Sequence, residues 1–439
     1  MEVEFVKKNH SKMKSKARMQ ASTENDGRDI EIRFITKDPR YAIAELPLSV
    51  HNSIDANELN TLINGFLAES NLVHHQVEFD FLVCSQFLRT SLIDHITEKG
   101  IPFENLIDVE YIEKYPSPEP KDCLIHDDWV SAIAVLEKWI LTGSYDNMIH
   151  IWTLQGEHLL DVPGHRAPVK AVAWIYINVH NASFASASMD QICMIWNWDM
   201  KKNSVECIYV CKGHRRSIEA LGINFERTLI ATGGWDNMLH LWSLSTQDDN
   251  EESSSKKAKL EHANRTKTPK CTMKGHKQAI SGIIWSGRME IITGSWDHTI
   301  KIWDTELGGI KHEIHGDKCF FDIDYSPHSR AVIAGSADQH VRLYDPRSTE
   351  GTIAKAKFTS HTQWVAAVHW APEDEHLFVS GAYDNTVKLW DTRSPKVPLF
   401  DLLGHEDKVL VCDWSYDKLI LSGGADNTLR IFKSKPFDS

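Results

Sequence analysis

A turn aspartate followed six residues later by an aromatic side chain recurs seven times in this chain. The pairs are Asp146 and Trp152, Asp190 and Trp196, Asp236 and Trp242, Asp297 and Trp303, Asp338 and Tyr344, Asp384 and Trp390, and Asp426 and Phe432. Successive aspartates are 44, 46, 61, 41, 46 and 42 residues apart, a period typical of four-stranded propeller blades, with one insertion. A unit of this size cannot bury its apolar face alone, so the copies must stack side by side.

A histidine precedes each turn aspartate by 20 to 25 residues. The seven are His126, His165, His214, His276, His315, His361 and His405, and four of them follow a glycine. Short apolar runs flank each turn and alternate with polar residues, which is the pattern of β-strands. With its Gly-His and Trp-Asp signatures the region resembles the WD-repeat proteins. The resemblance implies a mainly β fold, with a seven-bladed β-propeller over residues 126–433.

Closure of the ring needs a strand from outside the repeats. The last repeat ends at its third strand, Thr428 to Phe432, and an unclosed ring would expose strand edges. We expect the missing fourth strand to be Lys121 to Ile125, at the end of a linker formed by residues 116–125.

The histidine, serine and aspartate of each repeat could be mistaken for a hydrolase triad, for example His276, Ser295 and Asp297. In WD-repeat proteins these groups and the tryptophan form a buried hydrogen-bond network, and seven copies suit a structural brace rather than an active site. We therefore predict no catalytic residue and no enzymatic activity. Blade five, without a glycine before His315, is expected to be the least regular.

The net charge of the chain limits the kinds of partner that it is expected to bind. The 439 residues include 61 acidic and 48 basic side chains, a formal net charge of −13, which argues against a general nucleic-acid coat. No run of 18 apolar residues is present, so no membrane span is expected. Residues 1–28 are basic and without periodicity, and we expect a disordered tail. Two interpretations stay open for it: a plain solvated tail, or an import signal or rRNA contact.

Residues 29–115 read as a separate small α+β domain. Two strands are followed by a helix with Asp55 as its cap and Leu59, Leu62, Ile63, Phe66 and Leu67 on one face. Further short strands and a helical turn follow. This is the order of a ubiquitin-like β-grasp domain, although the composition alone supports only a generic α+β fold.

The combination of the two halves resembles one family of ribosome assembly factors. The segments FDFLV, FLRTSL and VEY, followed by DDWVSAI and seven WD repeats, are similar to the WD-repeat subunit of the PeBoW complex, whose N-terminal domain is Notchless-like and ubiquitin-like. The resemblance implies a Bop-type WD-repeat protein as direct partner, Pescadillo through Bop, precursors of the large ribosomal subunit, and the AAA ATPase midasin. It also implies a nuclear protein of the nucleolus and nucleoplasm, with no membrane association.

The same resemblance implies one metal contact. In that family an acidic residue of the ubiquitin-like domain completes the coordination of Mg²⁺ in the metal-ion-dependent adhesion site of midasin, and the matching residue is Glu104. Mg²⁺ accepts carboxylate oxygens from more than one molecule. Asp108 and Glu110 are weaker candidates. We expect no cofactor of the chain's own, only Mg²⁺ shared with midasin.

Large aromatic residues recur at the loop positions that face one rim in WD-repeat proteins. One position directly precedes the turn aspartate, and the other lies three residues after the repeat histidine. They place six candidates for partner binding: Trp129, Tyr145, Trp235, Trp296, Trp364 and Tyr383. Trp and Tyr dominate binding hot spots, so a docking surface is one interpretation. The other is that several of them pack within their turns.

Three other sequence features bear on the function. Residues 245–270 contain only one large apolar side chain, Leu260, and we predict a disordered insertion after blade three. Arg347 and Arg393 lie in boxes that resemble the adaptor-binding motif of cullin ubiquitin-ligase substrate receptors, the alternative function. A Notchless-type assembly factor is the nearer alternative, although eight blades would be expected there.

Cys207, Cys211 and His214 are loosely spaced like metal ligands, but without a fourth ligand we expect no zinc site.

Overall fold

The computed structural model describes residues 29–70, 76–100, 106–245, 265–348 and 354–434. They divide into one unit that ends at Tyr115 and a second that begins at Pro116. The basic tail predicted for residues 1–28 lies outside the described residues. Within the described part of the chain, no helix has the length and apolar character needed to cross a membrane.

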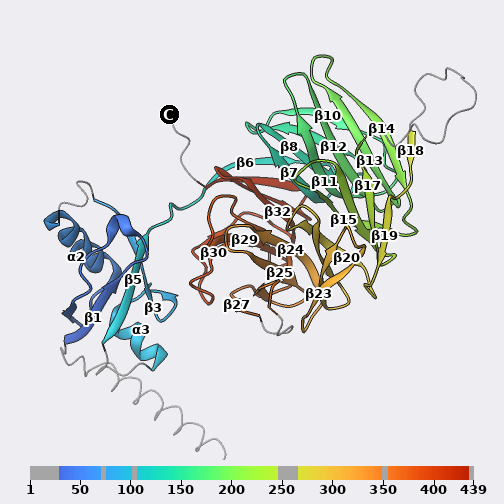
Figure 1. Ribbon diagram of the computed structural model, residues 1–439. Coiled ribbons are helices and arrows are strands. Elements are labelled where there is room, and N and C mark those ends of the chain that lie inside the picture. The colour runs from blue at the N-terminus through green and yellow to red at the C-terminus, as the bar shows by residue number, and fades with distance from the viewer. Residues whose placement is uncertain (1–28, 71–75, 101–105, 246–264, 349–353, 435–439) are drawn as a thin grey trace, which may run out of the picture. The chain divides into compact units, whose positions relative to one another are not determined.

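The first unit is a five-stranded mixed sheet packed against one long helix (Figure 1). Its elements in chain order are β1 Asp29–Ile35, a short 3₁₀ turn Pro39–Tyr41, β2 Pro47–His51, α2 Ala56–Glu69, β3 Phe79–Val83, β4 Gln86–Phe87, α3 Leu92–Lys99 and β5 Ile107–Glu113. The strand order is β2-β1-β5-β3-β4, with β1 and β5 parallel. This arrangement confirms the predicted β-grasp fold.

Helix α2 forms where the sequence predicts it. The Asp55 carboxylate accepts a hydrogen bond from the Glu58 backbone N–H at 2.8 Å, and the Glu58 carboxylate accepts one from the Asp55 backbone N–H at 3.3 Å, which makes a capping box. Leu59, Ile63 and Leu67, spaced four apart, are buried against the sheet. Their burial holds the helix across the sheet.

The second unit is a seven-bladed propeller, as predicted. The first three blades are β7 Val130–Leu136, β8 Trp139–Ser144, β9 Ile149–Thr153 and β10 His158–Val162; β11 Val169–Ile177, β12 Asn181–Ser188, β13 Ile192–Asp199 and β14 Ser204–Lys212; and β15 Ile218–Ile223, β16 Leu229–Gly234, β17 Met238–Ser243 and β19 Cys271–Lys274. The next three are β20 Ile280–Trp285, β21 Glu290–Ser295, β22 Thr299–Asp304 and β23 Gly309–His315; β24 Phe320–Ser326, β25 Ala331–Ser336, β26 His340–Tyr344 and β27 Ala356–Thr359; and β28 Val365–Trp370, β29 Leu377–Ala382, β30 Val387–Asp391 and β31 Phe400–Leu402.

The seventh blade joins the two ends of the repeat region. It consists of β32 Val409–Tyr416, β33 Leu419–Gly424, β34 Thr428–Lys433 and β6 Glu119–Ile125, which precedes the first blade in the chain. Strand β6 occupies the place predicted for the closing strand and begins two residues earlier, at Glu119. The innermost strands contact one another in cyclic order, and β7 of the first blade contacts β32 of the last.

A chain of buried hydrogen bonds braces the strands of most blades. In the fourth blade the Trp303 Nε1–H donates to Thr293 Oγ1 at 2.8 Å, Thr293 lies 2.7 Å from His276 Nε2, and His276 Nδ1 lies 2.9 Å from Asp297. A neutral histidine with its proton on Nδ1 satisfies every group in this chain. Burial lowers the pKa of His276, which favours that neutral form. The hydroxyl is that of Thr293, not the predicted Ser295. Thr293 lies two residues along β21 from Ile291, the residue opposite Trp303, and so on the same face of the sheet, whereas Ser295 lies farther along and donates to the Gln278 carbonyl.

Two blades build the brace differently from the prediction. In blade five His315 is exposed and Arg342 takes its place, donating to Ser336 Oγ at 2.8 Å and to Asp338 at 2.6 Å. In blade one His126 bonds to Thr142 at 2.9 Å, while Asp146 bonds to His150 instead. The prediction of one histidine network in every blade was therefore wrong for blade five, where a guanidinium four residues after the aspartate serves the same purpose.

The insertion predicted to be disordered is in part ordered. Residues 246–264 lie outside the described residues, but Arg265–Lys267 form β18, which pairs in parallel with β14 as a fifth strand of blade two. The Lys267 amine donates to the carbonyls of Ser243 and Ser245 and lies 4.0 Å from the Tyr209 ring centroid. Backbone pairing with an open strand edge compensates for the missing apolar side chains.

Two carboxylates, one buried and one half-buried, join blades five and six. Asp322 on β24 accepts a hydrogen bond from the Val368 N–H at 3.0 Å, and Asp324 accepts one from the Trp370 N–H at 2.7 Å. Burial raises the pKa of Asp322 to about 7. The folded chain therefore stabilises the protonated form of this side chain at a pH where the unfolded chain ionises it.

Replacing Thr293 with valine should destabilise the propeller. The Trp303 N–H and the His276 Nε2 would both lose their buried partner, and each loss costs about 1–3 kcal/mol. We expect the free energy of unfolding of the propeller, measured by urea titration, to fall by about 2–4 kcal/mol. The control is Thr305→Val, at a half-buried position of the same blade where the hydroxyl donates to the Met289 carbonyl at the surface. Equal midpoints for both variants would contradict the brace.

The Asp322→Asn variant should change the pH dependence of stability. Because the folded pKa lies above the value of about 3.9 for an unfolded aspartate, wild-type stability should fall as pH rises from about 4 to about 7. Asparagine keeps the acceptor oxygen and cannot ionise. Relative to wild type, the variant should gain up to about 4 kcal/mol between pH 4 and pH 8.

The control for this titration has the opposite sign. Arg347 lowers the pKa of Asp345, so Asp345→Asn should lose stability relative to wild type as pH rises. A difference between Asp322→Asn and wild type that does not change with pH would contradict the raised pKa.

Candidate docking surface at the channel mouth

Six aromatic side chains were predicted to share one rim of the propeller, and the structure places them in one band with a seventh, Phe321. We call this band the aromatic rim; it consists of Trp129, Tyr145, Trp235, Trp296, Phe321, Trp364 and Tyr383. Trp129, Trp235 and Trp364 are 41%, 38% and 50% exposed. The other four are half-buried.

The backbone fixes the aromatic residues that precede the turn aspartates. The N–H of Tyr145 donates to the Trp129 carbonyl at 2.9 Å, and the N–H of Tyr383 donates to the Trp364 carbonyl at 2.9 Å. Trp235 and Trp296 make the same bond to the loop before their own innermost strand. The residue after the turn aspartate has a positive φ in these blades, for example 71° at Asn147, which ends the turn tightly. These turns hold the four rings at one end of the blades.

The rings of blades three to six contact each other without a break. Ring centroids are 4.7 Å apart for Trp235 and Trp296, 5.9 Å for Trp296 and Phe321, and 5.7 Å for Phe321 and Trp364. Tyr383 lies 5.9 Å from Trp364 and 6.5 Å from Phe321. Half-exposed rings that support each other form a rigid apolar surface, which suits a protein partner.

A charged pair continues the rim through blades one to three. Trp129 lies 5.2 Å from Tyr145, and the Lys170 ammonium lies 5.3 Å from the Tyr145 ring centroid and 3.2 Å from its hydroxyl. Lys170 also pairs with Glu219 at 3.3 Å, and Glu219 accepts a hydrogen bond from the Trp235 indole at 2.8 Å. Burial would lower the pKa of Lys170, but Glu219 and Tyr145 raise it, so the ammonium stays charged.

The rim surrounds a cavity of about 330 Å³ at the mouth of the central channel. Its lining includes the second residue of each innermost strand: Ser131, Lys170, Glu219, Ser281, Phe321, Ala366 and Leu410. Sequence reasoning missed Phe321, Lys170 and Glu219. The signal that identifies them is their place directly after the buried first residue of each innermost strand, since side chains alternate along a strand.

Lys408 extends the surface to blade seven. Its ammonium lies 5.3 Å from the Tyr383 ring centroid, and a cavity of about 610 Å³ that includes Trp364, Tyr383 and Lys408 opens beside the rim. All seven blades therefore contribute a side chain to the band. Its chemistry is aromatic with two lysines, one of which is paired with an acid.

The remaining predicted residues lie elsewhere. Glu104 lies outside the described residues. Arg347 and Arg393 each bind a neighbouring carboxylate through two nitrogens, Asp345 at 3.0 and 3.1 Å and Asp391 at 2.9 and 2.6 Å. Arg393 follows β30 at the end opposite Tyr383. His214 bonds to Asp236 and Thr232 as part of the brace, and no group of converging metal-ligand atoms among the described residues includes Cys207 or Cys211.

Comparison with known families matches both units. Residues 30–96 match the NLE (NUC135) domain, and seven segments between 120 and 433 match the WD domain, G-beta repeat. Similar proteins named "Ribosome biogenesis protein WDR12 homolog" occur in Aedes aegypti, with 51% identity over 92% of this chain and 96% of the relative, and in Anopheles gambiae, with 50% identity over 92% and 95%. The Drosophila virilis relative of the same name is 47% identical over 94% and 97%.

Proposed function

Since this chain belongs to the family of the WDR12-type ribosome biogenesis proteins, we propose that it is a non-enzymatic assembly factor of the large ribosomal subunit. The propeller docks on a Bop-type WD-repeat protein and, through it, joins Pescadillo on pre-ribosomal particles. The ubiquitin-like unit offers a carboxylate to the Mg²⁺ of midasin. The ATPase then removes the complex from the maturing particle, in the nucleolus and nucleoplasm.

The aromatic rim carries the docking part of the proposal. Trp and Tyr are the residues most enriched in binding hot spots, and such residues need rigid support and removal from water on binding. Trp296 and Phe321 lie at the centre of the contiguous rings and have ring neighbours on both sides. A partner that covers them would gain affinity without ordering new side chains.

The midasin contact is assigned to Glu104 because the family resemblance implies it, and the acids nearest to it in the sequence fit the role less well. Asp108 on β5 is held by two hydrogen bonds from Arg33, at 2.8 and 3.0 Å, and Glu110 lies 3.2 Å from the Lys37 amine. These carboxylates have partners within the domain. The segment that holds Glu104 lies between Gly100, which caps α3 at φ 66°, and Ile107, which begins β5.

A single carboxylate fits the requirement of the partner's ion. Mg²⁺ favours hard oxygen ligands in octahedral geometry and is commonly bound through one or two carboxylates, with other groups completing the shell. When bound, the ion would supply the electrostatic link between the two proteins. This chain would contribute one oxygen ligand and no catalytic step.

Loss of the central rings should weaken docking of the Bop-type protein. Removing a hot-spot aromatic costs about 2 kcal/mol or more, so the Trp296→Ala and Phe321→Ala variants should each bind at least ~30-fold more weakly by calorimetry. The control is Leu307→Ala, an 83% exposed apolar residue of blade four after β22, the strand that follows the Trp296 turn. Full binding by both rim variants, with loss in the control, would place the interface on another face.

Loss of the Glu104 carboxylate should abolish binding to midasin but not docking. For the full chain with the metal-site domain of midasin, we expect binding that requires Mg²⁺ and disappears in Glu104→Ala. In cells this variant should still enter pre-ribosomes and should block release, so that late precursors accumulate.

Asp108→Asn is the matched control for the midasin experiment, because it removes an acid of the following strand, β5, that Arg33 already neutralises. It should retain Mg²⁺-dependent binding. Binding that ignores both Mg²⁺ and Glu104→Ala would remove Glu104 from the mechanism and leave the docking proposal intact.

A further inference from the structure

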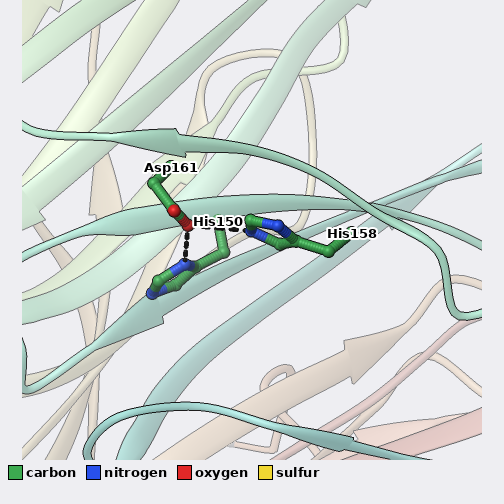
Figure 2. Close-up of side chains that lie close together, drawn as sticks. All are labelled: His150, His158 and Asp161. Atoms are coloured by element: carbon green, nitrogen blue, oxygen red, sulfur yellow. Dashed lines mark hydrogen bonds and ion pairs between the residues drawn. The ribbon is translucent and has the colours of Figure 1, made fainter.

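Three potential metal-ligand side chains converge on the outer strands of the first blade (Figure 2). His150 lies on β9, and His158 and Asp161 lie on β10. His150 Nδ1 is 2.7 Å from Asp161 Oδ1, and His158 Nε2 is 2.8 Å from the same oxygen. Two imidazole nitrogens and a carboxylate therefore meet at one point.

A strand irregularity produces this convergence. Asp161 pairs directly opposite His150, so the two side chains share a face of the sheet. In a regular strand, residues 158 and 161 would point to opposite faces. The register shifts between His158 and Leu160, which puts His158 opposite Trp152 and on the same face as Asp161. The His158 ring also packs 4.5 Å from the Trp152 ring, which orients it.

The hydrogen bonds of His150 call for a cation at the meeting point. Its Nε2 lies 3.0 Å from Asp146 Oδ2 and must donate there, because a carboxylate only accepts. In a neutral ring Nδ1 is then a bare acceptor, yet it faces the acceptor oxygen of Asp161 at 2.7 Å. A second proton fits between two such acceptors at 2.7 Å. A metal ion would take its place once the ligand atoms move apart to roughly 3.3 Å, the separation that tetrahedral bonds of about 2.0 Å require.

Equivalent positions in other blades supply this cation from a lysine. Four residues after the turn aspartate, blade four has Lys301, whose amine lies 2.7 Å from Glu313 on the outer strand. Blade six has Lys388, 2.7 Å from Asp401. Blade one replaces the fixed positive charge with His150 and adds His158, which has no counterpart in these two pairs.

We infer that His150, His158 and Asp161 form a binding site for one divalent transition-metal ion, with Zn²⁺ the best fit. Two imidazoles and a carboxylate are common zinc ligands, and a water would complete a tetrahedral set. The side chains of His158 and Asp161 are 38% and 52% exposed, so an ion and its water can enter. Asp146 would orient the ligand His150, as second carboxylates do in zinc sites.

The site would link β9 and β10 next to the junction where the closing strand β6 pairs with β34. The turn between β9 and β10 contacts the closing strand β6, where Lys121 donates to the Leu154 carbonyl and Asp122 lies against Gly156. A bound ion would hold β10 to β9 at this junction. This is a structural role, and it differs from the expectation that the chain has no metal of its own. It does not rest on the proposed partners.

Zinc binding to the full chain, stripped of metal by a chelator, tests the site. Calorimetry should show one saturable Zn²⁺ site per chain, and Co²⁺ should give the visible absorption of a tetrahedral complex. His158→Gln and Asp161→Asn each remove one ligand at an exposed position and should weaken Zn²⁺ binding at least tenfold. His180→Gln, at an exposed histidine outside the cluster, should leave it unchanged.

A second readout separates metal binding from folding. Zn²⁺ should raise the thermal midpoint of wild type and of His180→Gln, but not of the two ligand variants, whose metal-free midpoints should match wild type. Mg²⁺, which prefers oxygen ligands, should have no effect. Equal Zn²⁺ affinity in wild type and ligand variants, or no saturable Zn²⁺ site in wild type, would overturn the inference and leave a protonated His150 between the two aspartates.

Discussion

The buried hydrogen-bond chain of each blade is the interaction on which the rest of the structure depends. In blade four, Thr293 and Trp303 join the second and third strands to His276 in the loop before the first. In blade five, Arg342 on the third strand replaces the histidine. It also positions the turn aspartate, and in four blades the residue before that aspartate contributes an aromatic side chain to the rim. The brace therefore sets both the stability of a blade and the place of its binding residue. Because it acts within each blade separately, the sequences of the exposed loops can vary while the ring is retained.

Much of the architecture could be predicted because the constraint repeats. Seven turn aspartates at a regular spacing imply seven blades, and the cap and apolar face of α2 are local signals that short sequence windows contain. The substitution of Arg342 for a repeat histidine could not be predicted in this way. The Arg342 side chain enters the brace from β26, not from the loop where the histidine normally lies. Contacts of this kind are seen only in the three-dimensional structure. The same holds for His150, which replaces His126 as the partner of Asp146.

The candidate surface was predicted in part. Loop positions identified six aromatic residues, since their place relative to the turn is fixed by the repeat. Phe321 joins the two tryptophans on either side of it, yet it lies in a strand and has no repeat signature of its own. Strand β18 was missed for a related reason: its side chains carry no apolar pattern, and its stability comes from backbone pairing with β14. Features that depend on contacts between distant segments are the hardest to predict from a single sequence, because they have no local sequence pattern.

The closing strand has a mechanical consequence. Five residues separate the end of β5 in the ubiquitin-like unit from the start of β6, and β6 is hydrogen-bonded to β34 from Glu119 to Ile125. Any tension applied to the N-terminal unit therefore enters the propeller through the strand that locks it. A load directed along β6 is shared by all of its hydrogen bonds at once, whereas a load across it would peel them one by one from Glu119. The fold thus resists a force along β6 better than a force across it. The direction of the force therefore decides whether the propeller stays closed or opens where β6 pairs with β34.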